Sequence, residues 1–244
     1  MQLFFVDKEA VKEDFVHISG RDVNHIRNVL RMKEGEEVMV SDETSFYLST
    51  IKEISKEEVL LKVKEQKEID TELPASLYLF QGLPKKDKMD FIIMKTVELG
   101  VHTIVPVATK RAVVKLDEKK ADKKLIRWQQ IAETAAKQSK RGRIPKVNEV
   151  LSFKEALLMA KDLDVILCPY EEAKGMNYTK EVLGQLEKGC RIGIFIGPEG
   201  GFAQSEVAEL QEAGAKVITL GKRILRTETA GMFVLSVLSY LLES

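Results

Sequence analysis

The sequence contains few of the residues on which several classes of protein depend. Its 244 residues include two cysteines, three histidines and one tryptophan. Cys168 and Cys190 show no paired spacing, which argues against a disulfide framework, and both lie in or beside apolar runs where buried thiols are expected. His17, His25 and His102 lack metal-ligand spacing, so we expect no metal centre. We also find no Ser-His-Asp or Cys-His arrangement that predicts nucleophilic catalysis.

The sequence also shows little sign of a signal-peptide pattern at its start and has no long apolar segment. It begins Met1-Gln2-Leu3-Phe4-Phe5-Val6-Asp7-Lys8, without the basic and then apolar pattern of a signal peptide. The longest apolar stretch, 230–242, is shorter than the roughly 20 residues that span a bilayer. We therefore expect a cytoplasmic protein with no membrane partner.

A net charge of one sign is absent as well, because Lys+Arg and Asp+Glu both number 38. The charge is nevertheless unevenly distributed. Residues 110–146, called the basic segment below, hold thirteen basic and four acidic residues, a local charge of +9 that leaves −9 for the rest of the chain. Such a concentration is what binding to a phosphate backbone requires. A solvated, lysine-rich helix face explains it equally well.

The apolar pattern divides the chain into two predicted domains, residues 1–72 and 73–244. The first has short β-like runs at 37–40, 46–51 and 59–63 after a helix at about 21–30, which predicts a small antiparallel barrel, and its acidic end, 64–72, predicts a linker. The second alternates strands and helices, which predicts an α/β fold with a mainly parallel sheet. The expected strands are 76–81, 103–107, 165–168, 191–196 and 216–220. The expected helices are 86–99, 119–140, 153–161, 180–187, 204–212 and 228–241.

Two loops that follow strands of this second domain are the best candidates for a ligand site. The first, here called the glycine loop, is Gly197-Pro198-Glu199-Gly200-Gly201-Phe202. It lacks the spacing of a Rossmann fingerprint or a P-loop, but its glycines allow backbone groups to approach a flat ligand closely. An ordinary strand-to-helix turn is the alternative.

In an open α/β sheet, ligands bind beyond the carboxyl ends of the strands. We therefore expect the glycine loop and the second loop, described next, to form one pocket.

The second loop, here called the arginine loop, is Leu220-Gly221-Lys222-Arg223-Ile224-Leu225-Arg226. Thr227 is a plausible N-cap of the helix that follows, so a capped helix after a basic loop is the simple interpretation. The functional interpretation is a cationic edge that holds a phosphate or stabilises negative charge on a substrate. The helix itself is apolar nearly all round, which predicts burial under the sheet, against a second subunit, or both.

These stretches resemble the RsmE family of bacterial ribosomal RNA methyltransferases, within the SPOUT (trefoil-knot) superfamily. The resemblance covers essentially the whole chain and is most specific at 196–202 and 220–230. Further matching stretches are His25…Asn28-Val29-Leu30-Arg31…Gly35, Gln81-Gly82-Leu83-Pro84-Lys85, Lys95-Thr96-Val97-Glu98-Leu99-Gly100, and Arg127-Trp128 with Ala135-Ala136…Gln138-Ser139.

The resemblance implies a PUA-like RNA-binding barrel over 1–72 and a SPOUT trefoil-knot methyltransferase domain over 73–244. It implies S-adenosylmethionine as the methyl donor and N3 of a uridine in 16S ribosomal RNA, free or in the 30S subunit, as the acceptor. It also implies a homodimer with active sites at the subunit interface. Two rival hypotheses are a non-catalytic RNA-binding assembly factor on the same fold and a nucleotide-binding metabolic enzyme without an RNA partner.

Three sets of site residues follow on this basis. We expect Arg226 or Arg223 to stabilise an anionic uracil, with Glu199 as base or orienting group, although a structural turn residue is equally plausible at position 199. The donor-binding set is Leu167, Ile196, Gly197, Pro198, Glu199, Gly200, Leu220, Gly221, Ile224 and Leu225. The RNA-binding set is Arg27, Arg31, Lys85, Lys137, Lys140, Arg141 and Arg143, for which solvated helix positions are the alternative.

Overall fold

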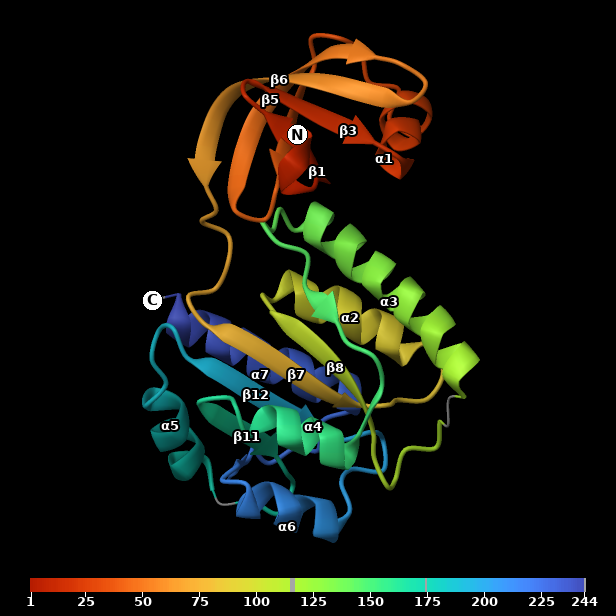
Figure 1. Ribbon diagram of the computed structural model, residues 1–244. Coiled ribbons are helices and arrows are strands. Elements are labelled where there is room, and N and C mark those ends of the chain that lie inside the picture. The colour runs from red at the N-terminus through yellow and green to blue at the C-terminus, as the bar shows by residue number, and fades with distance from the viewer. Residues whose placement is uncertain (115–116, 174, 244) are drawn as a thin grey trace. The chain divides into compact units, whose positions relative to one another are not determined.

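The structure is a computed structural model that describes residues 1–114, 117–173 and 175–243 (Figure 1). Lys115 of the basic segment lies outside the described residues. The chain forms two compact units, Met1–Glu72 with Ala136–Ile144, and Leu73–Ala135 with Pro145–Ser244. Residues 136–144 therefore belong to the first unit, whereas the sequence pattern assigned them to the second domain.

The first unit is built on a mostly antiparallel sheet in the order β1-β4-β5-β6-β3-β2, in which only the β1–β4 pair is parallel. Its strands are β1 (Gln2–Phe5), β2 (Val11–Lys12), β3 (Phe15–Ser19), β4 (Glu37–Ser41), β5 (Ser45–Ile54) and β6 (Glu58–Glu68). A single-turn helix, α1 (Arg21–Asn24), continues into a π-helical turn (His25–Val29), and a 3-10 turn covers Lys8–Ala10.

Alternating burial explains the strands of this unit. Val38 and Val40 of β4, and Val59 and Leu61 of β6, are fully buried at every second position. The three predicted runs lie within β4, β5 and β6, but the sequence pattern missed β1, β2 and β3. The predicted linker at 64–72 is wrong for its first half, because β6 continues to Glu68 and pairs there with the start of β5. The charged side chains at this end of β6 are mostly exposed, which hid the strand from an apolar pattern.

The second unit contains a seven-stranded sheet in which every pair is parallel, in the order β10-β8-β7-β12-β11-β13 with β9 beside β8. Its strands are β7 (Ser76–Gly82), β8 (Thr103–Ala108), β9 (Lys146–Val147), β10 (Leu151–Ser152), β11 (Val165–Pro169), β12 (Arg191–Ile196) and β13 (Lys216–Ile218). The five predicted strands agree with five of these, and the two-residue strands β9 and β10 were not predicted.

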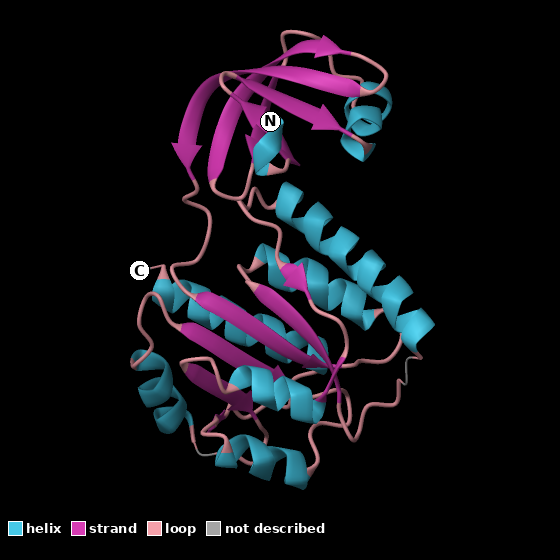
Figure 2. Cartoon of the chain, viewed as in Figure 1, coloured by secondary structure: helices cyan, strands magenta, loops and turns pink. Residues whose placement is uncertain are grey.

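Helices cover both faces of this sheet (Figure 2). The helices are α2 (Lys88–Glu98), α3 (Glu118–Gln138), α4 (Phe153–Ala160), α5 (Met176–Gly184), α6 (Gln204–Glu212) and α7 (Thr227–Leu242). Helices α2 and α7 pack together on one face, and α4 and α6 lie on the other (Figure 1). The predicted helix at 180–187 is displaced, because α5 begins four residues earlier, at Met176, and ends at Gly184.

Aromatic packing fixes the face of the sheet beneath α4 and α6. Phe80 of β7 and Phe195 of β12 are fully buried and stack with their ring centroids 4.3 Å apart. Phe153 of α4 meets Phe195 edge-on at 6.4 Å. Such ring pairs add about 1 kcal/mol each beyond their burial. This core holds β7 and β12 in register, so their carboxyl ends meet at one edge of the sheet.

Helix α7 is buried on one side only. Val234, Leu235 and Leu238 are almost completely buried, whereas Phe233, Tyr240 and Leu241 are 41%, 78% and 42% exposed. The expectation that most sides of this helix are covered is therefore not met within the described chain. No described helix is both long enough and apolar enough to cross a membrane.

Candidate functional site

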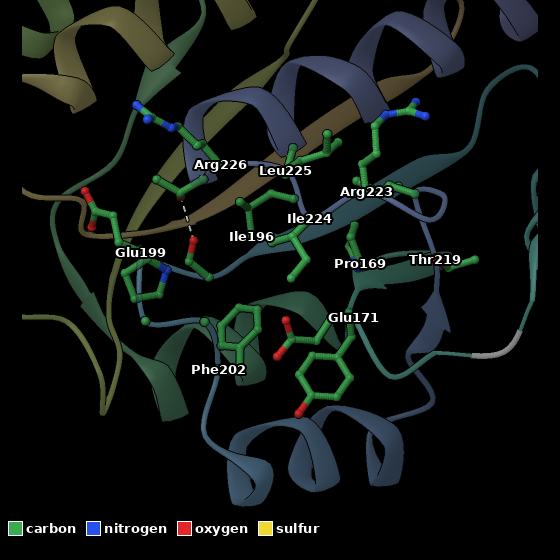
Figure 3. Close-up of a pocket in the computed structure, with 18 of the residues that line it drawn as sticks. Pro169, Glu171, Ile196, Glu199, Phe202, Thr219, Arg223, Ile224, Leu225 and Arg226 are labelled. Atoms are coloured by element: carbon green, nitrogen blue, oxygen red, sulfur yellow. Dashed lines mark hydrogen bonds between the residues drawn. The ribbon is translucent and has the colours of Figure 1, made fainter.

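A cavity of about 610 Å³ lies at the carboxyl ends of β11, β12 and β13 in the second unit. The glycine loop and the arginine loop both line it, as does the segment from Pro169 to Glu171 after β11. This volume lies within the range of roughly 300–1,000 Å³ that is usual for small-molecule sites. Two loops that are about twenty residues apart in sequence thus share one pocket (Figure 3).

The glycine loop is packed too tightly against its neighbours to carry side chains at critical points. A Cβ on Gly197 would lie 3.0 Å from the carbonyl carbon of Gly201 and 3.1 Å from the Phe202 nitrogen. A Cβ on Gly82, at the end of β7, would lie 2.6 Å from Cδ of Pro198. The backbone N–H of Gly201 donates to the Pro198 carbonyl at 2.9 Å and closes the loop into a tight turn. The glycines of the turn therefore add only backbone atoms to the lining of the cavity, beside the side chains of Pro198 and Glu199.

A hydrogen-bond chain joins the end of β7 and the start of α7 to the glycine loop. Thr227 Oγ1 donates to the carbonyl of Gly197 at 2.6 Å, and Gln81 Nε2 donates to Thr227 Oγ1 at 2.9 Å. Arg226, not Thr227, is the N-cap residue of α7, and its side chain makes no capping hydrogen bond, so the N-cap prediction for Thr227 is wrong. The Thr227 hydroxyl bridges the start of α7 to the glycine loop instead. Our sequence reasoning assigned no role to Gln81, although its position at the end of a strand, next to Gly82, was a usable signal.

Glu199 is an anchored carboxylate rather than a free one. It accepts the backbone N–H of Lys85 at 3.1 and 3.2 Å, and Lys88 Nζ lies 3.0 Å from its Oε1 and 3.2 Å from Glu228 Oε2. Burial raises the pKa of Glu199, but hydrogen bonds from its own backbone N–H, from Lys88 and from Lys85 outweigh burial and hold that pKa below its ordinary value. A carboxylate of low pKa is a weak general base, so this geometry favours the orienting role. The ion pairs also raise the pKa of Lys88.

The two arginines of the arginine loop lie at different places around the cavity. Figure 3 shows Arg226 on the same side of the cavity as Glu199, and Arg223 on the opposite side of the view. Both side chains are exposed, and within the part of the chain that the structure describes neither guanidinium has a hydrogen bond or an ion pair. Arg226 is therefore a free cation at the rim, available to an anionic ligand.

Nine of the ten residues in the predicted donor-binding set line the cavity. Leu167 is not among the lining residues, because it is fully buried within β11. Pro169, Tyr170 and Glu171 line the cavity instead, since the strand ends there and its backbone becomes accessible. Arg111, from the loop after β8, also lines the cavity and was not predicted for this site.

The predicted RNA-binding residues differ in their availability. Arg27, Arg31, Lys85, Lys140 and Arg143 are exposed. Arg141, in contrast, is only 4% exposed and forms an ion pair with Glu72. Its guanidinium is therefore committed within the first unit, which corrects its placement among the RNA contacts. Lys137 is half-buried and pairs with Asp22 at 3.0 Å.

Comparisons with known proteins agree with this picture. A model of the RNA methyltransferase domain matches residues 71–239, and a model of the RNA methyltransferase PUA domain matches residues 18–64. The chain is 40% identical to the ribosomal RNA small subunit methyltransferase E of Bacillus subtilis, over 100% of this chain and 98% of that protein. It is 34% identical to the protein of the same name from Mesomycoplasma hyopneumoniae, over 97% of this chain and 98% of that one. A crystal structure of the Neisseria gonorrhoeae methyltransferase of this name, bound to S-adenosyl methionine, superposes with a TM-score of 0.84 at 31% identity, covering 99% of this chain and 98% of that one.

Proposed function

Because the chain belongs to the ribosomal RNA small subunit methyltransferase E family, we propose that it transfers a methyl group from S-adenosylmethionine to 16S ribosomal RNA. The resemblance drawn from the sequence motifs is thereby confirmed. The predicted fold class, a SPOUT trefoil-knot α/β domain with a PUA-like N-terminal domain, is confirmed as well. The observation that carries the proposal is the single cavity shared by the glycine loop and the arginine loop.

The cavity suits the proposed donor. S-adenosylmethionine supplies a methyl group that its sulfonium already activates, so the protein has to bind, orient and exclude water. The glycines of the glycine loop offer backbone groups without side chains, and Ile196, Ile224 and Leu225 offer apolar contact for an adenosine. Holding the two reactants in line is a large share of such catalysis.

We propose N3 of a uridine as the acceptor atom, as the RsmE resemblance implies. This nitrogen carries a proton and lies on the pairing edge, so the base must be unpaired when it enters the site. In this proposal N3 gives its proton to solvent, and the Arg226 guanidinium stabilises the negative charge left on the ring, which lowers the barrier to that loss. The N3–methyl bond then forms as the bond between the methyl group and the donor's sulfur breaks. Glu199, held by Lys88 and the Lys85 N–H, orients this side of the site and does not accept the proton.

Two variants test these roles, with donor binding and methyl transfer measured separately. We expect Arg226→Ala to bind S-adenosylmethionine with nearly unchanged affinity in calorimetry and to lose about a hundredfold in methyl transfer, the usual effect of losing one oxyanion-stabilising group. Arg223→Ala is the matched control from the same loop and should keep most of the rate. Glu199→Gln should lower the rate less than Arg226→Ala. Wild-type transfer rates in Arg226→Ala would refute the assignment of Arg226.

We propose further that the exposed side of α7 forms a homodimer interface. Phe233 and Leu241 are large apolar side chains, 41% and 42% exposed, on a helix whose N-cap residue, Arg226, lies on the rim of the cavity. Exposed apolar groups gathered on one helix are typical of a subunit contact. A partner bound there would bring the second subunit close to the active site.

The exposed residues of the predicted RNA-binding set remain our candidates for phosphate contacts. A ribosomal RNA substrate would place the enzyme in the cytoplasm.

A further inference from the structure

Glu206 is a buried carboxylate to which the proposed methyl transfer gives no role. It is the third residue of α6 and is 0% exposed. Its Oε2 accepts the backbone N–H of Ala203 at 2.8 Å, and its Oε1 accepts the backbone N–H of Lys110 at 2.8 Å. Burial of a carboxylate is costly unless its oxygens are hydrogen-bonded, and here each oxygen has a backbone donor. The N-terminus of α6 adds a favourable dipole.

The two donors belong to loops that meet at the cavity. Ala203 directly follows the glycine loop, and Lys110 precedes Arg111 in the loop after β8. Arg111 Nη1 donates to the carbonyl of Gly200 at 3.0 Å, so the loop after β8 supports the glycine loop at a second point. Glu206, 96 residues after Lys110, thus joins this supporting loop to the end of the glycine loop.

A simple helix-capping role explains only half of this arrangement. Ala203, the N-cap residue of α6, has no side-chain acceptor, so Glu206 supplies only the return bond of a capping box. The bond to Lys110 contributes nothing to the helix. It constrains the position of the loop that carries Arg111.

We propose that Glu206 is a positioning residue for donor binding, which holds the glycine loop in its binding conformation through Lys110 and Arg111. This inference rests on the proposed function. A glutamine at this position has one acceptor oxygen, and its amide group would face one of the two backbone N–H donors, so one attachment is lost. A hydrogen bond to a charged group contributes about 1.5–3 kcal/mol, which corresponds to roughly tenfold or more in a binding constant.

The test compares Glu206→Gln with Glu212→Gln, an exposed glutamate at the C-terminal end of the same helix, in the full-length protein. We expect Glu206→Gln to raise the Kd and KM for S-adenosylmethionine by about tenfold, while kcat at saturating donor stays within about threefold. Hydrogen exchange without donor should speed up at the Lys110 and Gly201 amides. Glu212→Gln should match the wild type in every measurement.

A second variant separates positioning from capping. In Glu206→Asp the carboxylate keeps its charge and stays near the Ala203 N–H. The shorter side chain lacks one methylene group and cannot also keep the bond to the Lys110 N–H. We expect it to resemble Glu206→Gln in donor affinity, and it carries the test if Glu206→Gln does not fold. Wild-type donor affinity in either folded variant would overturn this inference alone. A wild-type chain that binds no donor would overturn the proposed function as well.

Discussion

Replacing Gly197 by alanine perturbs a crowded point in the lining of the cavity. The added methyl group would lie 3.0–3.1 Å from three backbone atoms of Gly201 and Phe202. Ordinary van der Waals contact begins at 3.4 Å, so the turn would have to move by a few tenths of an ångström. Backbone cannot rotate away as the end of a flexible side chain can. The glycine loop must therefore change shape or carry strain.

The size of the effect follows from this contact geometry. Overpacking by one methyl group in a close-packed region costs about 1–3 kcal/mol. If the turn relaxes, the cost is seen as lost donor affinity, since the backbone groups that line the cavity move with it. If the turn does not relax, the cost is seen as lost stability. We expect relaxation to dominate because the turn lies at the cavity surface, which corresponds to roughly a tenfold rise in the Kd for S-adenosylmethionine.

Calorimetry with S-adenosylmethionine and thermal unfolding together measure both parts. Gly184→Ala is a suitable control, because Gly184 is the last residue of α5, has no atom within 4 Å of an added Cβ, and does not line the cavity. Alanine should stabilise that helix slightly. If Gly197→Ala binds the donor within about twofold of the wild type and unfolds at the same temperature, the close packing inferred for the glycine loop is wrong.

Three further predictions concern acid stability, the first unit and the subunit contact. The pKa of Glu199 lies below its ordinary value of 4.5, so the contribution of Glu199 to stability is present above pH 4.5 and is lost as the pH falls through the folded-state pKa. Lys88→Met should flatten the resulting acid decline in unfolding temperature. An unchanged pH profile would refute the coupling between Glu199 and Lys88. Arg141→Met should destabilise the first unit by about 3 kcal/mol, because it leaves Glu72 without its buried partner, and a variant as stable as the wild type in denaturant titration would refute a stabilising role for this ion pair. Phe233→Ser should convert a dimer to a monomer in sedimentation, whereas a wild-type protein that is already monomeric would exclude the proposed interface.

The regular elements of the second unit followed from the sequence because their signals are local. The strand at 191–196 and the helix at 204–212 have the predicted bounds, since apolar runs and flanking polar turns mark both ends. The first unit was harder to predict because β1 and β3 are short, and β3 mixes partly exposed with buried positions. Their strand character depends on pairing with β4 and β6, which are distant in sequence.

The candidate site shows the same division between local and distant information. The glycine loop and the arginine loop were recognisable from their composition, and both line the cavity. The hydrogen bonds that hold them were not, because Gln81 meets Thr227 across 146 residues and Lys110 meets Glu206 across 96. Similarly, nothing near Arg141 in the sequence shows that its guanidinium forms an ion pair with Glu72. Local pattern identifies residues that can bind a ligand, but only the fold shows which charges are already paired.

The central claim, methylation of a uridine in 16S ribosomal RNA, is tested most directly by mass spectrometry of that RNA from a strain lacking the protein. We expect one methylated uridine to be absent from the deletion strain, restored by the wild-type chain, and not restored by Arg226→Ala. A 16S ribosomal RNA with the same methylated nucleosides in the deletion strain and the parent would contradict it.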